Sequence, residues 1–451
     1  MRTFLTNLPW GLNGRFGVRA GSRWPFTSLP EKDGKIHYIP FPFFLAYATS
    51  LLKKHFKEVK LLDCITGEID ELELIEAIGG YNPGLVVIET STPSFKNDIK
   101  IITNISQEFE DLKIALCGPH ASVFAAQILK EHNFIDYVLL GEYEYALLDL
   151  VRHLEGTLNL RSVPALSYRE NGNIVTNDFR YETGDLDTLP WPERDDLPIY
   201  NYNDGFCNLP KPNVQIWSSR GCPFHCAFCL WPQTMYKEYK YRKRGPSTVV
   251  NEMDYLIKKF GFKAVYFDDD VFNIDKGHVL AICKEIEKRS IKIPWAAMAR
   301  ADLMDKELLE IMRNCGLYAI KYGIESANQE ILDFCKKNMD LSVATSMISL
   351  TKKLGIKVHL TFCLGLPQET KATINNTAKF IQETRPDSFQ VSIATPFPGT
   401  EYYEYLEEKG LLVSKDWSDY DGNYKYIVKN QELDANDLEG IRDALNSNSN
   451  L

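Results

Sequence analysis

The sequence has no long apolar run and no excess of positive charge. Its N-terminus, MRTFLTNLPW, lacks the apolar stretch of a signal peptide, and the most apolar early run, residues 39–52, contains two prolines. That run is also shorter than the roughly 20 residues that span a bilayer. With 51 basic and 61 acidic residues the formal net charge is −10, whereas proteins that coat nucleic acid are usually basic. We therefore expect a cytoplasmic protein with no membrane span and no nucleic-acid partner.

The sequence also lacks the dense cysteine pattern of a disulfide framework. It has 10 cysteines in 451 residues, and thiols in a cytoplasmic protein stay reduced. Three of them fall close together, at Cys222, Cys226 and Cys229. The others stand alone and are expected to be buried as small apolar side chains: Cys64, Cys117, Cys207, Cys283, Cys315, Cys335 and Cys363.

The N-terminal part of the chain alternates short apolar strands with amphipathic helices. Overall, 44% of the residues are apolar and 25% are charged, as in a globular protein with a core, and the length indicates two or three domains. The alternation over residues 1–155 predicts a doubly wound, Rossmann-like domain with a parallel sheet between helices. Ligands bind to such sheets in loops after the strands, here residues 90–94, 118–121 and 141–144. The expected strands are Thr3–Leu8, Val59–Leu62, Leu85–Glu89, Lys113–Cys117 and Tyr137–Leu140.

Residues 156–212 have a different character. Asn171-Gly172-Asn173 predicts a hairpin turn between two short strands, and five prolines follow between Pro190 and Pro212. We expect this segment to be a linker that wraps between domains. Residues 401–451 are expected to form a short polar C-terminal segment with a mobile tail.

Residues 213–400 alternate strands and helices again. Six strand–helix units are too few for an eight-fold barrel and too many for a small doubly wound domain. We therefore predict a partial (βα)6 barrel of the TIM type, in which the chemistry lies on the loops after the strands. The expected strands are Val214–Ser218, Ala264–Asp268, Ile293–Ala299, Leu317–Ile324, Lys357–Leu364 and Ser388–Thr395.

The three clustered cysteines follow the first strand of this barrel with the spacing C-x3-C-x2-C. Their thiolates can converge on one metal ion or cluster. Structural zinc needs four ligands, usually from two cysteine pairs, but no second pair is present and His225 is adjacent to Cys226. A four-iron cluster held by three cysteines would keep one iron open. We favour the cluster over a zinc knuckle or structural cysteines that neighbour one another by chance.

This motif, with Phe228 before the last cysteine, resembles that of the radical S-adenosylmethionine (SAM) superfamily. The resemblance implies a 4Fe–4S cluster on Cys222, Cys226 and Cys229, with SAM on the open iron. One electron, from a donor such as flavodoxin or ferredoxin, would split SAM into methionine and a 5′-deoxyadenosyl radical. That radical abstracts hydrogen from an unactivated C–H bond. The cysteines would thus be both metal ligands and catalytic residues.

Later loops resemble the SAM site of the same superfamily. Asp268 and Asp270 follow the second strand, on one side by strand periodicity, and would receive the SAM amino group. Arg300, after the third strand, would pair with the SAM carboxylate. The segment 322–326 resembles the ribose-contacting loop, and the basic run 241–244 faces SAM, the electron donor or solvent. The expected SAM contacts are Phe228, Asp268, Asp270, Arg300, Glu325, Ser326 and Gly365.

The N-terminal loops resemble the cobalamin-binding half of cobalamin-dependent radical SAM enzymes. The resemblance rests on Gly118-Pro-His120-Ala, on Gly141-Glu142 and on Pro40-Phe-Pro42. The motif D-x-H-x-x-G is absent, so no histidine is expected on cobalt. Residues 17–25, with glycine, arginine and tryptophan, are expected to wall the site or to form a surface loop. The expected cobalamin contacts are Thr90, Ser91, Gly118, His120, Gly141 and Glu142.

The main functional hypothesis is a cobalamin-dependent methyltransferase that acts on an unactivated carbon. By resemblance, one SAM would supply the methyl group to cobalamin and a second would generate the substrate radical that takes it. Alternatives are a rearrangement or cyclisation, phosphorus methylation, SAM-only radical chemistry with an empty N-terminal sheet, and a non-enzymatic iron–sulfur electron-transfer module. Only about 50 residues follow the barrel, which favours a small, lipid-like or protein-presented substrate.

Overall fold

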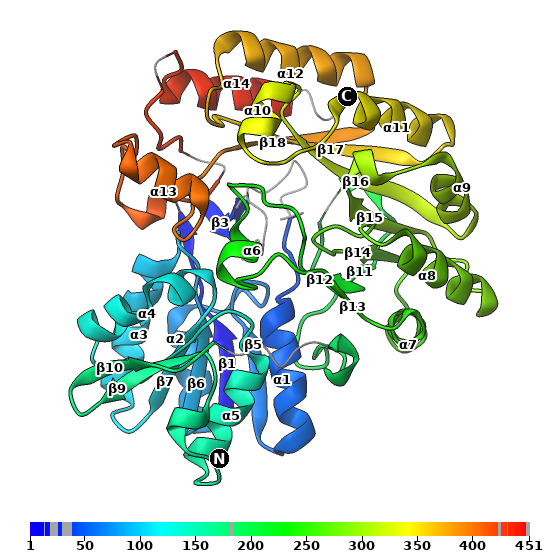
Figure 1. The fold of residues 1–451 in the computed structure, drawn as a ribbon. Helices are drawn as coiled ribbons and strands as arrows, with labels where there is room; N and C mark the ends of the chain where they lie inside the picture. Colours follow the sequence, from blue (N-terminus) through cyan, green and yellow to red (C-terminus); the bar gives the residue numbers. More distant parts are fainter. Residues whose placement is uncertain are drawn as a thin grey trace.

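The computed structural model contains two α/β halves packed against each other, the first below the second in Figure 1. It describes residues 1–12, 14–18, 26–28, 38–179, 185–204, 206–422, 425–430 and 432–447. Most of the stretch 17–25 and the tail 448–451 therefore lie outside the described residues. No described helix combines the length and the apolar character that a membrane crossing requires.

The first sheet has seven strands in the order β10-β9-β8-β7-β6-β1-β5. Its strand residues alternate between two cores, with Leu5 and Val87 in one and Phe4 and Ile88 in the other. Burial on both faces explains the apolar runs, and the predicted doubly wound architecture is confirmed. The parallel strands are β1 (Thr3–Asn7), β5 (Val59–Asp63), β6 (Leu85–Glu89), β7 (Lys113–Cys117) and β8 (Tyr137–Leu139).

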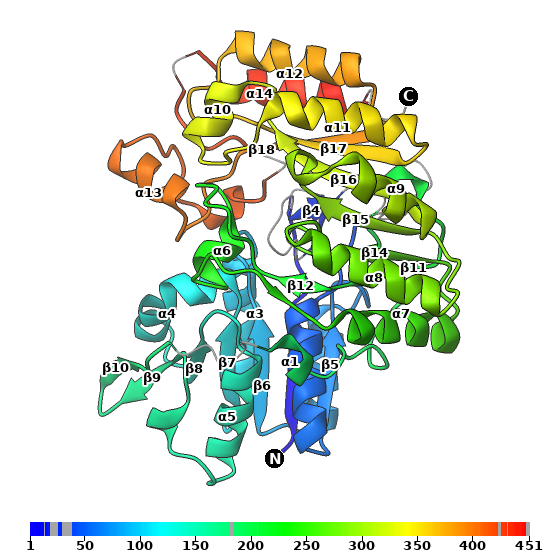
Figure 2. The same ribbon diagram turned by 45° about the vertical axis from the view of Figure 1, so that its right-hand side comes forward.

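Helices cover both faces of this sheet. The helices α1 (Phe43–His55) and α5 (Glu144–Leu154) pack into one core, and α2 (Glu71–Tyr81), α3 (Phe95–Glu108) and α4 (Pro119–Glu131) into the other. Strand β1 lies between β5 and β6, so the strand order reverses there, as at the ligand-binding crevice of open sheets. The loops after the parallel strands point toward the second half (Figure 2).

Part of the predicted linker belongs to the first sheet. The predicted hairpin forms β9 (Leu166–Glu170) and β10 (Asn173–Thr176), and β9 pairs antiparallel with β8. Farther along, the short helix η3 (Phe206–Asn208) packs Phe206 against Tyr266 of the second sheet, with ring centroids 5.0 Å apart. The segment 156–212 therefore packs against both halves. The predicted domain boundaries at 155, 212 and 400 stay predictions.

The second sheet has six parallel strands in chain order and does not close on itself, which confirms the partial barrel. Helices lie along its outer face (Figure 1). The strands are β11 (Asn213–Ile216), β14 (Ala264–Phe267), β15 (Trp295–Ala299), β16 (Leu317–Glu325), β17 (Lys357–Leu364) and β18 (Ser388–Ile393). The helices are α7 (Pro246–Phe260), α8 (Lys276–Lys288), α9 (Lys306–Asn314), α10 (Gln329–Phe334), α11 (Leu341–Lys353) and α12 (Lys371–Thr384).

Three short elements surround the cysteine motif at the end of β11. They are β12 (Ser219–Arg220), β13 (Arg242–Lys243) and α6 (Leu230–Thr234). The two strands pair antiparallel, with Arg220 opposite Arg242. The cysteine loop therefore lies between β12 and α6, at the carboxyl edge of the barrel.

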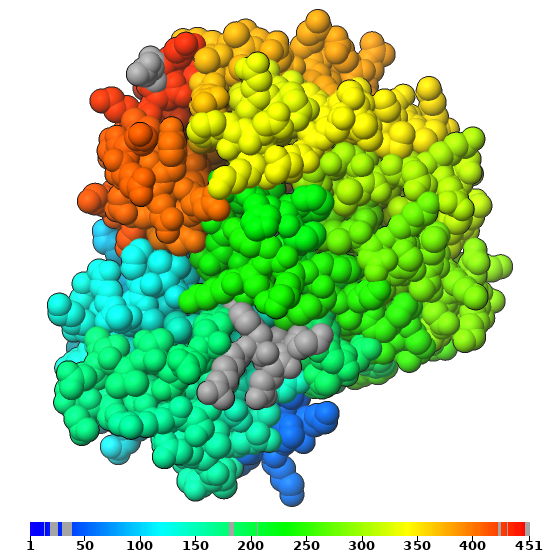
Figure 3. Space-filling model, viewed as in Figure 1, coloured from blue at the N-terminus to red at the C-terminus, as the bar shows by residue number. Residues whose placement is uncertain are grey.

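The C-terminal segment packs on both halves, and Figure 3 shows it in orange between them. It contains α13 (Glu401–Glu408), η5 (Trp417–Asp419) and α14 (Ala435–Ser447). Helix α14 covers the barrel edge, because the Asn446 amide bonds the backbone N and O of Val391 at 2.9 Å each. Near the N-terminus, β2 (Gly11–Leu12), β3 (Arg15–Gly17) and β4 (Thr27–Ser28) form a small sheet, and Thr27 donates to Asp421 at 2.6 Å.

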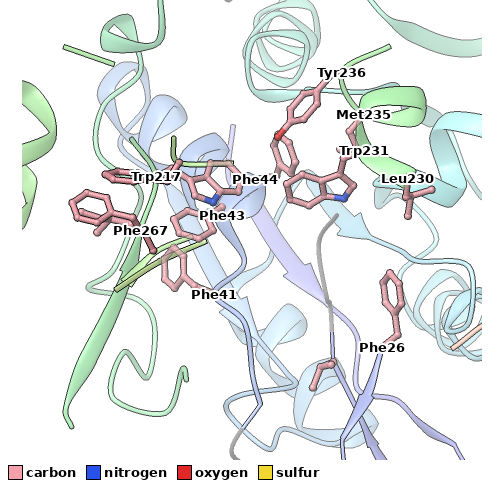
Figure 4. Packing of buried hydrophobic residues seen from close by; sticks show 14 of the residues in the cluster. Phe26, Phe41, Phe43, Phe44, Trp217, Leu230, Trp231, Met235, Tyr236 and Phe267 are labelled. Carbon is pink, nitrogen blue, oxygen red and sulfur yellow. The ribbon is translucent and has the colours of Figure 1, made fainter. Parts of the chain in front are cut away.

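Aromatic side chains join the two halves into one core (Figure 4). The ring of Phe43 on α1 stacks on Trp217 after β11 with centroids 4.0 Å apart. Phe44 contacts Trp217 and Trp231 at 5.5 and 5.0 Å. Large buried aromatic surfaces contribute much of the hydrophobic stabilisation of a core, and this core holds the cysteine loop against the first half.

Candidate active site at the mouth of the barrel

The start of the cysteine loop has a tightly constrained backbone. Gly221 has a φ of +85°, and a Cβ there would lie 2.0 Å from the carbonyl oxygen of Lys240, so only glycine fits. The Oδ2 atom of Asp270 accepts hydrogen bonds from Gly221 N at 3.0 Å and from the Tyr236 hydroxyl at 2.8 Å. The loop after β14 thus holds the first turn of the cysteine loop.

The thiols of Cys222, Cys226 and Cys229 line one cavity, as the motif predicts. In the described part of the chain, no three His, Cys, Asp or Glu side chains surround a single point as one metal ion requires. In a four-iron cluster each thiolate binds a separate iron, so the thiols need not meet at one point. The geometry therefore suits a cluster better than a zinc knuckle.

Burial controls the protonation of these thiols. It raises the pKa of Cys222 to about 12 and also raises the pKa of Cys226. Burial and the two neighbouring thiols raise the pKa of Cys229 well above its ordinary value. Iron ligation requires thiolates, so loading of the site must release protons and is favoured as pH rises.

The three aspartates after β14 have different surroundings. Asp269 accepts hydrogen bonds from the backbone N and hydroxyl of Ser218 and from the Ser219 hydroxyl, and burial raises its pKa to about 6. Asp270 lines the cavity with the cysteines. Asp268 is buried and is not among the described lining residues, because β14 ends before it and strand alternation does not continue.

Arg300 lies at the cavity but its guanidinium is engaged. Two of its nitrogens donate to the carboxylate of Asp302 at 3.1 and 2.8 Å, and further bonds reach the carbonyls of Lys337 and Asn338 at 2.9 and 3.2 Å. The guanidinium also lies 3.7 Å from the ring centre of Phe224, a cation–π contact. Arg300 therefore joins the cysteine loop to the turn after α10, and a SAM carboxylate would have to share it with Asp302.

The remaining predicted SAM contacts divide between the cavity and its supports. Glu325 lines the cavity, and its Oε1 lies 3.2 Å from the Nζ of Lys337, which lines it too. Phe228 is in the lining as well. Ser326 and Gly365 are not among the described lining residues. Gly365 has a φ of +85°, and a Cβ there would lie 2.4 Å from the ring of Tyr426.

The inner faces of the barrel strands extend the cavity beyond the predicted residues. Lys321 on β16 pairs with Asp204 at 2.6 Å, and its side chain is 4% exposed. Lys321 was not singled out from the sequence, although a charged residue inside an otherwise apolar strand is a signal that could have found it. Gly323 of the segment 322–326 also lines the cavity, and further lining residues on these strands are Met298, Ala299, Thr361, Phe362, Gln390 and Ser392.

In the first half, the polar residues after β6 face inward. The hydroxyls of Thr90 and Ser94 donate to the buried Asp98 at 2.7 and 2.6 Å, and the Ser91 hydroxyl lies 2.9 Å from that of Ser94. Gly118 has a φ of +101°, and a Cβ there would lie 2.3 Å from the carbonyl oxygen of Thr90. The ends of β6 and β7 approach each other so closely that a glycine is needed at position 118 whether or not a cofactor binds there.

His120 is packed among aromatic rings at the start of α4. Ring centroids lie at 4.2 Å from Phe95, 4.8 Å from Phe124 and 5.5 Å from Trp417, and Nδ1 lies 3.2 Å from the Thr92 hydroxyl. Burial lowers the pKa of His120 to about 3, so the ring is neutral at ordinary pH. The C-terminal segment, through Trp417, covers this loop.

Glu142 binds the barrel half. Its carboxylate lies 2.9 Å from Nη1 of Arg220 and 2.7 Å from Nη2 of Arg242, and its side chain is buried. Gly141 has a φ of +62°, and a Cβ there would lie 2.6 Å from the carbonyl oxygen of Met235. The loop after β8, predicted to contact cobalamin, thus contacts the segments on both sides of the cysteine loop. Arg220 was not singled out from the sequence, although it lies only two positions before Cys222.

The basic run 241–244 is also engaged within the protein. Arg244 pairs with Glu252 at 2.6 Å in a buried site, and Lys243 pairs with Asp275 at 2.5 Å on the surface. The charged groups of this run therefore meet carboxylates of the chain itself.

Comparisons with known proteins agree with this arrangement. Residues 34–151 match the B12 binding domain, and residues 218–381 match the radical SAM superfamily. Over 381 residues the chain is 30% identical to the uncharacterized methyltransferase PH0819 of Pyrococcus horikoshii, covering 84% of this chain and 81% of that protein. The chain belongs to the cobalamin-dependent radical SAM enzymes. The predicted family and its cofactor set, a 4Fe–4S cluster, SAM and cobalamin, are thereby confirmed.

Two further proteins are similar to this chain over most of its length. The anaerobic magnesium-protoporphyrin IX monomethyl ester cyclase of Rubrivivax gelatinosus is 26% identical, covering 90% of this chain and 72% of that protein. The structure of the enzyme OxsB with aqua-cobalamin and SAM bound superposes with a TM-score of 0.73 at 18% identity. That match covers 96% of this chain and 64% of OxsB, and at this identity it supports the fold alone.

Proposed function

We propose that this enzyme is a cobalamin-dependent radical SAM methyltransferase that acts on an unactivated carbon of a small molecule. The observation that carries the proposal is the single cavity lined by Cys222, Asp270 and Glu325 of the barrel and by Tyr38 of the first half. Residues of both halves therefore line the same cavity, which supports a reaction space shared by the two cofactors. The methyltransferase name of the 30% identical relative supports the same reaction.

The three cysteines are the proposed ligands of the cluster. Asp270, which faces the cavity, is the proposed partner of the SAM amino group, with Asp268 behind it. Glu325 is proposed for the ribose and Arg300 for the carboxylate. Once bound, the cluster supplies the electron that cleaves SAM, and cobalamin carries the methyl group.

The remaining predicted SAM contacts act from around the cavity. Phe228 is proposed as a wall of the SAM site. Neither Ser326 nor Gly365 is among the described lining residues. We therefore propose that they support the loops behind the SAM site and do not contact SAM with their side chains.

Cobalamin contacts in the first half are proposed to come from backbone groups. The side chains of Thr90, Ser91 and His120 are taken up by internal contacts, so the loops that contain them, with Gly118 and Gly141, would present amides and carbonyls. Glu142 is assigned to the interface between the halves. The proposal includes a cytoplasmic location and a flavodoxin or ferredoxin as electron donor.

The decisive experiment follows the fate of SAM in anaerobic protein reconstituted with iron and sulfide. Dithionite and SAM are added with hydroxocobalamin bound, and the matched preparation omits cobalamin. We expect 5′-deoxyadenosine in both and S-adenosylhomocysteine only with cobalamin, because methyl transfer leaves the homocysteine product. Absence of S-adenosylhomocysteine from the loaded enzyme would contradict methyl transfer.

The second candidate is a radical ring closure that uses both cofactors. The cyclase relative, which aligns with 90% of this chain, favours it. A cyclase of this type would form 5′-deoxyadenosine without S-adenosylhomocysteine, so the same measurement separates the two candidates.

A further inference from the structure

The cysteine loop is held on both sides by one short loop of the first half. On its N-terminal side, Arg220 Nη1 lies 2.9 Å from Glu142 and 2.7 Å from Glu144. On its C-terminal side, the backbone N of Glu142 donates to the carbonyl of Met235 at 3.1 Å. Arg242, paired with Arg220 in the β12–β13 ladder, adds a 2.7 Å contact to Glu142. We call Glu142, Glu144, Arg220 and Arg242 the clasp.

The clasp is buried and pairs two acidic with two basic side chains. Its two carboxylates and two guanidinium groups have side chains that are 0%, 0%, 2% and 9% exposed. The guanidinium of Arg220 also lies 4.7 Å from the ring centre of Tyr47 and 5.1 Å from that of Trp217. Burial of charge costs several kcal/mol per ion before pairing, and the surrounding aromatic core could have joined the halves without it.

Unlike an apolar contact, a charge-assisted hydrogen bond also restricts the relative orientation of the two groups that it joins. The hydrogen bond from Arg220 Nη1 to Glu142 fixes a distance and an angle at Arg220, and Glu144 adds a charge contact at 2.7 Å. Arg220 is separated from Cys222 only by Gly221, whose backbone is itself fixed by Lys240 and Asp270. A shift of the loop after β8 would therefore move the first cysteine.

We propose that Glu142 and Glu144 are positioning residues: through Arg220 they set the orientation of the cysteine loop relative to the first half. The loop that the sequence assigns to cofactor contact would then couple the cobalamin half to the iron site. This role rests on the proposed function only in one respect, namely that the cysteine loop holds the cluster. The contacts that orient the loop are formed by the chain itself, without any cofactor.

The test compares Glu144→Gln and Arg220→Lys with Glu252→Gln in full-length, cluster-free protein. Glu252 pairs with Arg244 at 2.6 Å with side chains 1% and 4% exposed, so it is a matched buried ion pair, and its two ionic partners, Arg244 and Arg194, lie outside the clasp. Hydrogen exchange of peptides covering residues 219–235 is measured for each. We expect exchange of residues 221–229 to rise about tenfold in the two clasp variants and to stay near the parent value in Glu252→Gln.

Equal exchange in the clasp and control variants would overturn the proposal, since the clasp would then contribute stability alone. If Arg220→Lys or Glu144→Gln fails to fold, Glu142→Gln serves instead, because its amide oxygen still accepts from Arg220. In the reconstituted protein, the electron paramagnetic resonance signal of the reduced cluster should shift in the clasp variants only. Failure of the wild-type protein to cleave SAM would refute the proposed function. The hydrogen-exchange comparison would still decide the role of the clasp, because it uses cluster-free protein.

Discussion

The two halves of the molecule use their ligand loops differently. In the barrel, Cys222, Asp270 and Glu325 come from the loops or ends of three separate strands and face one cavity. In the first half, the polar side chains after the strands turn inward, as Thr90 does toward Asp98, or outward to the barrel, as Glu142 does toward Arg220. Under the proposed function, the barrel would offer side chains to its ligands, whereas the first half uses these side chains to hold its own loops and the barrel.

This difference indicates which substitutions should change ligand binding or activity and which should change the stability of the fold. Changes at barrel loops should alter binding or activity in an otherwise folded protein. Changes at the loops of the first half should act first on stability or on the contact between the halves.

The largest effect is expected at the cysteines. Cys222→Ala, Cys226→Ala or Cys229→Ala should each abolish iron loading and 5′-deoxyadenosine formation together, because three ligands are the minimum that keeps one iron open. Iron content and product are measured after reconstitution. Cys283→Ala, at a buried site on α8, is the control and should load iron normally. A cysteine variant that still made 5′-deoxyadenosine at the parent rate would remove that residue from the ligand set.

The next effect concerns Gly118. Gly118→Val should cost roughly 3 kcal/mol or more of folding free energy, because its Cβ would clash with the Thr90 carbonyl at a positive φ. Gly156 also has a positive φ but no atom within 4 Å, so Gly156→Val should cost only about 1–2 kcal/mol. Urea unfolding and uptake of hydroxocobalamin are measured for both. Full stability of Gly118→Val with loss of cobalamin uptake would show that the glycine serves the corrin instead.

The fold was predictable wherever burial on both faces makes a strand apolar along its whole length. Strand β6 begins and ends at the predicted residues, because the apolar run from Leu85 to Ile88 is bounded by Gly84 on one side and by the polar Glu89 and Thr90 on the other. Strand β14 ends one residue early, at Phe267, and two residues later the carboxylate of Asp269 bonds Ser218 and Ser219 beyond the end of β11. The local pattern of apolar residues predicts the bounds of β6, but it carries no information about the side-chain contacts at the end of β14.

The cysteines of the site could be predicted because their spacing is local. Their supports could not: Arg220 and Glu142 are 78 positions apart, and Trp417 reaches His120 from the C-terminal segment. These contacts depend on how the two halves pack, which no window of the sequence records. Lys337, the partner of Glu325, lies in a turn with no motif at all.

In the barrel, a buried carboxyl should make stability depend on pH. Burial raises the pKa of Glu369 from 4.5 to about 8, so the native state prefers the protonated form. The stability is fully present below pH 4.5 and is lost as pH rises toward 8, by about 3 kcal/mol at pH 6.5. Glu369→Gln keeps an acceptor for the Gly365 amide and should gain stability over the parent as pH rises. The exposed Glu404→Gln should show no such trend, and an equal trend in both variants would contradict the assignment.

At the cavity, Asp270 and Asp268 separate direct contact from support. Asp270→Asn should weaken SAM binding by about 1.5–3 kcal/mol, the range for a lost charge-assisted hydrogen bond. Asp268→Asn should weaken it less, because Asp268 is not among the described residues of the cavity lining. Equilibrium binding of SAM to the reconstituted protein is measured, with iron content as the control for an intact cluster. Equal affinity in both variants and the parent would make the aspartates structural.

In the first half, the corresponding pH effect should have the opposite direction. Burial lowers the pKa of His120 from 6.5 to about 3, so the native state excludes the proton that an unfolded histidine binds below pH 6.5. The stability is present above pH 6.5 and is lost as pH falls, by about 2 kcal/mol at pH 5. His120→Gln should therefore lose less stability than the parent between pH 7 and 5, whereas the exposed His55→Gln should follow the parent. Thermal unfolding at the two pH values measures this. An unchanged acid sensitivity in His120→Gln would mean that the ring accepts a proton in place, and that the loop after β7 is more open than its aromatic packing indicates.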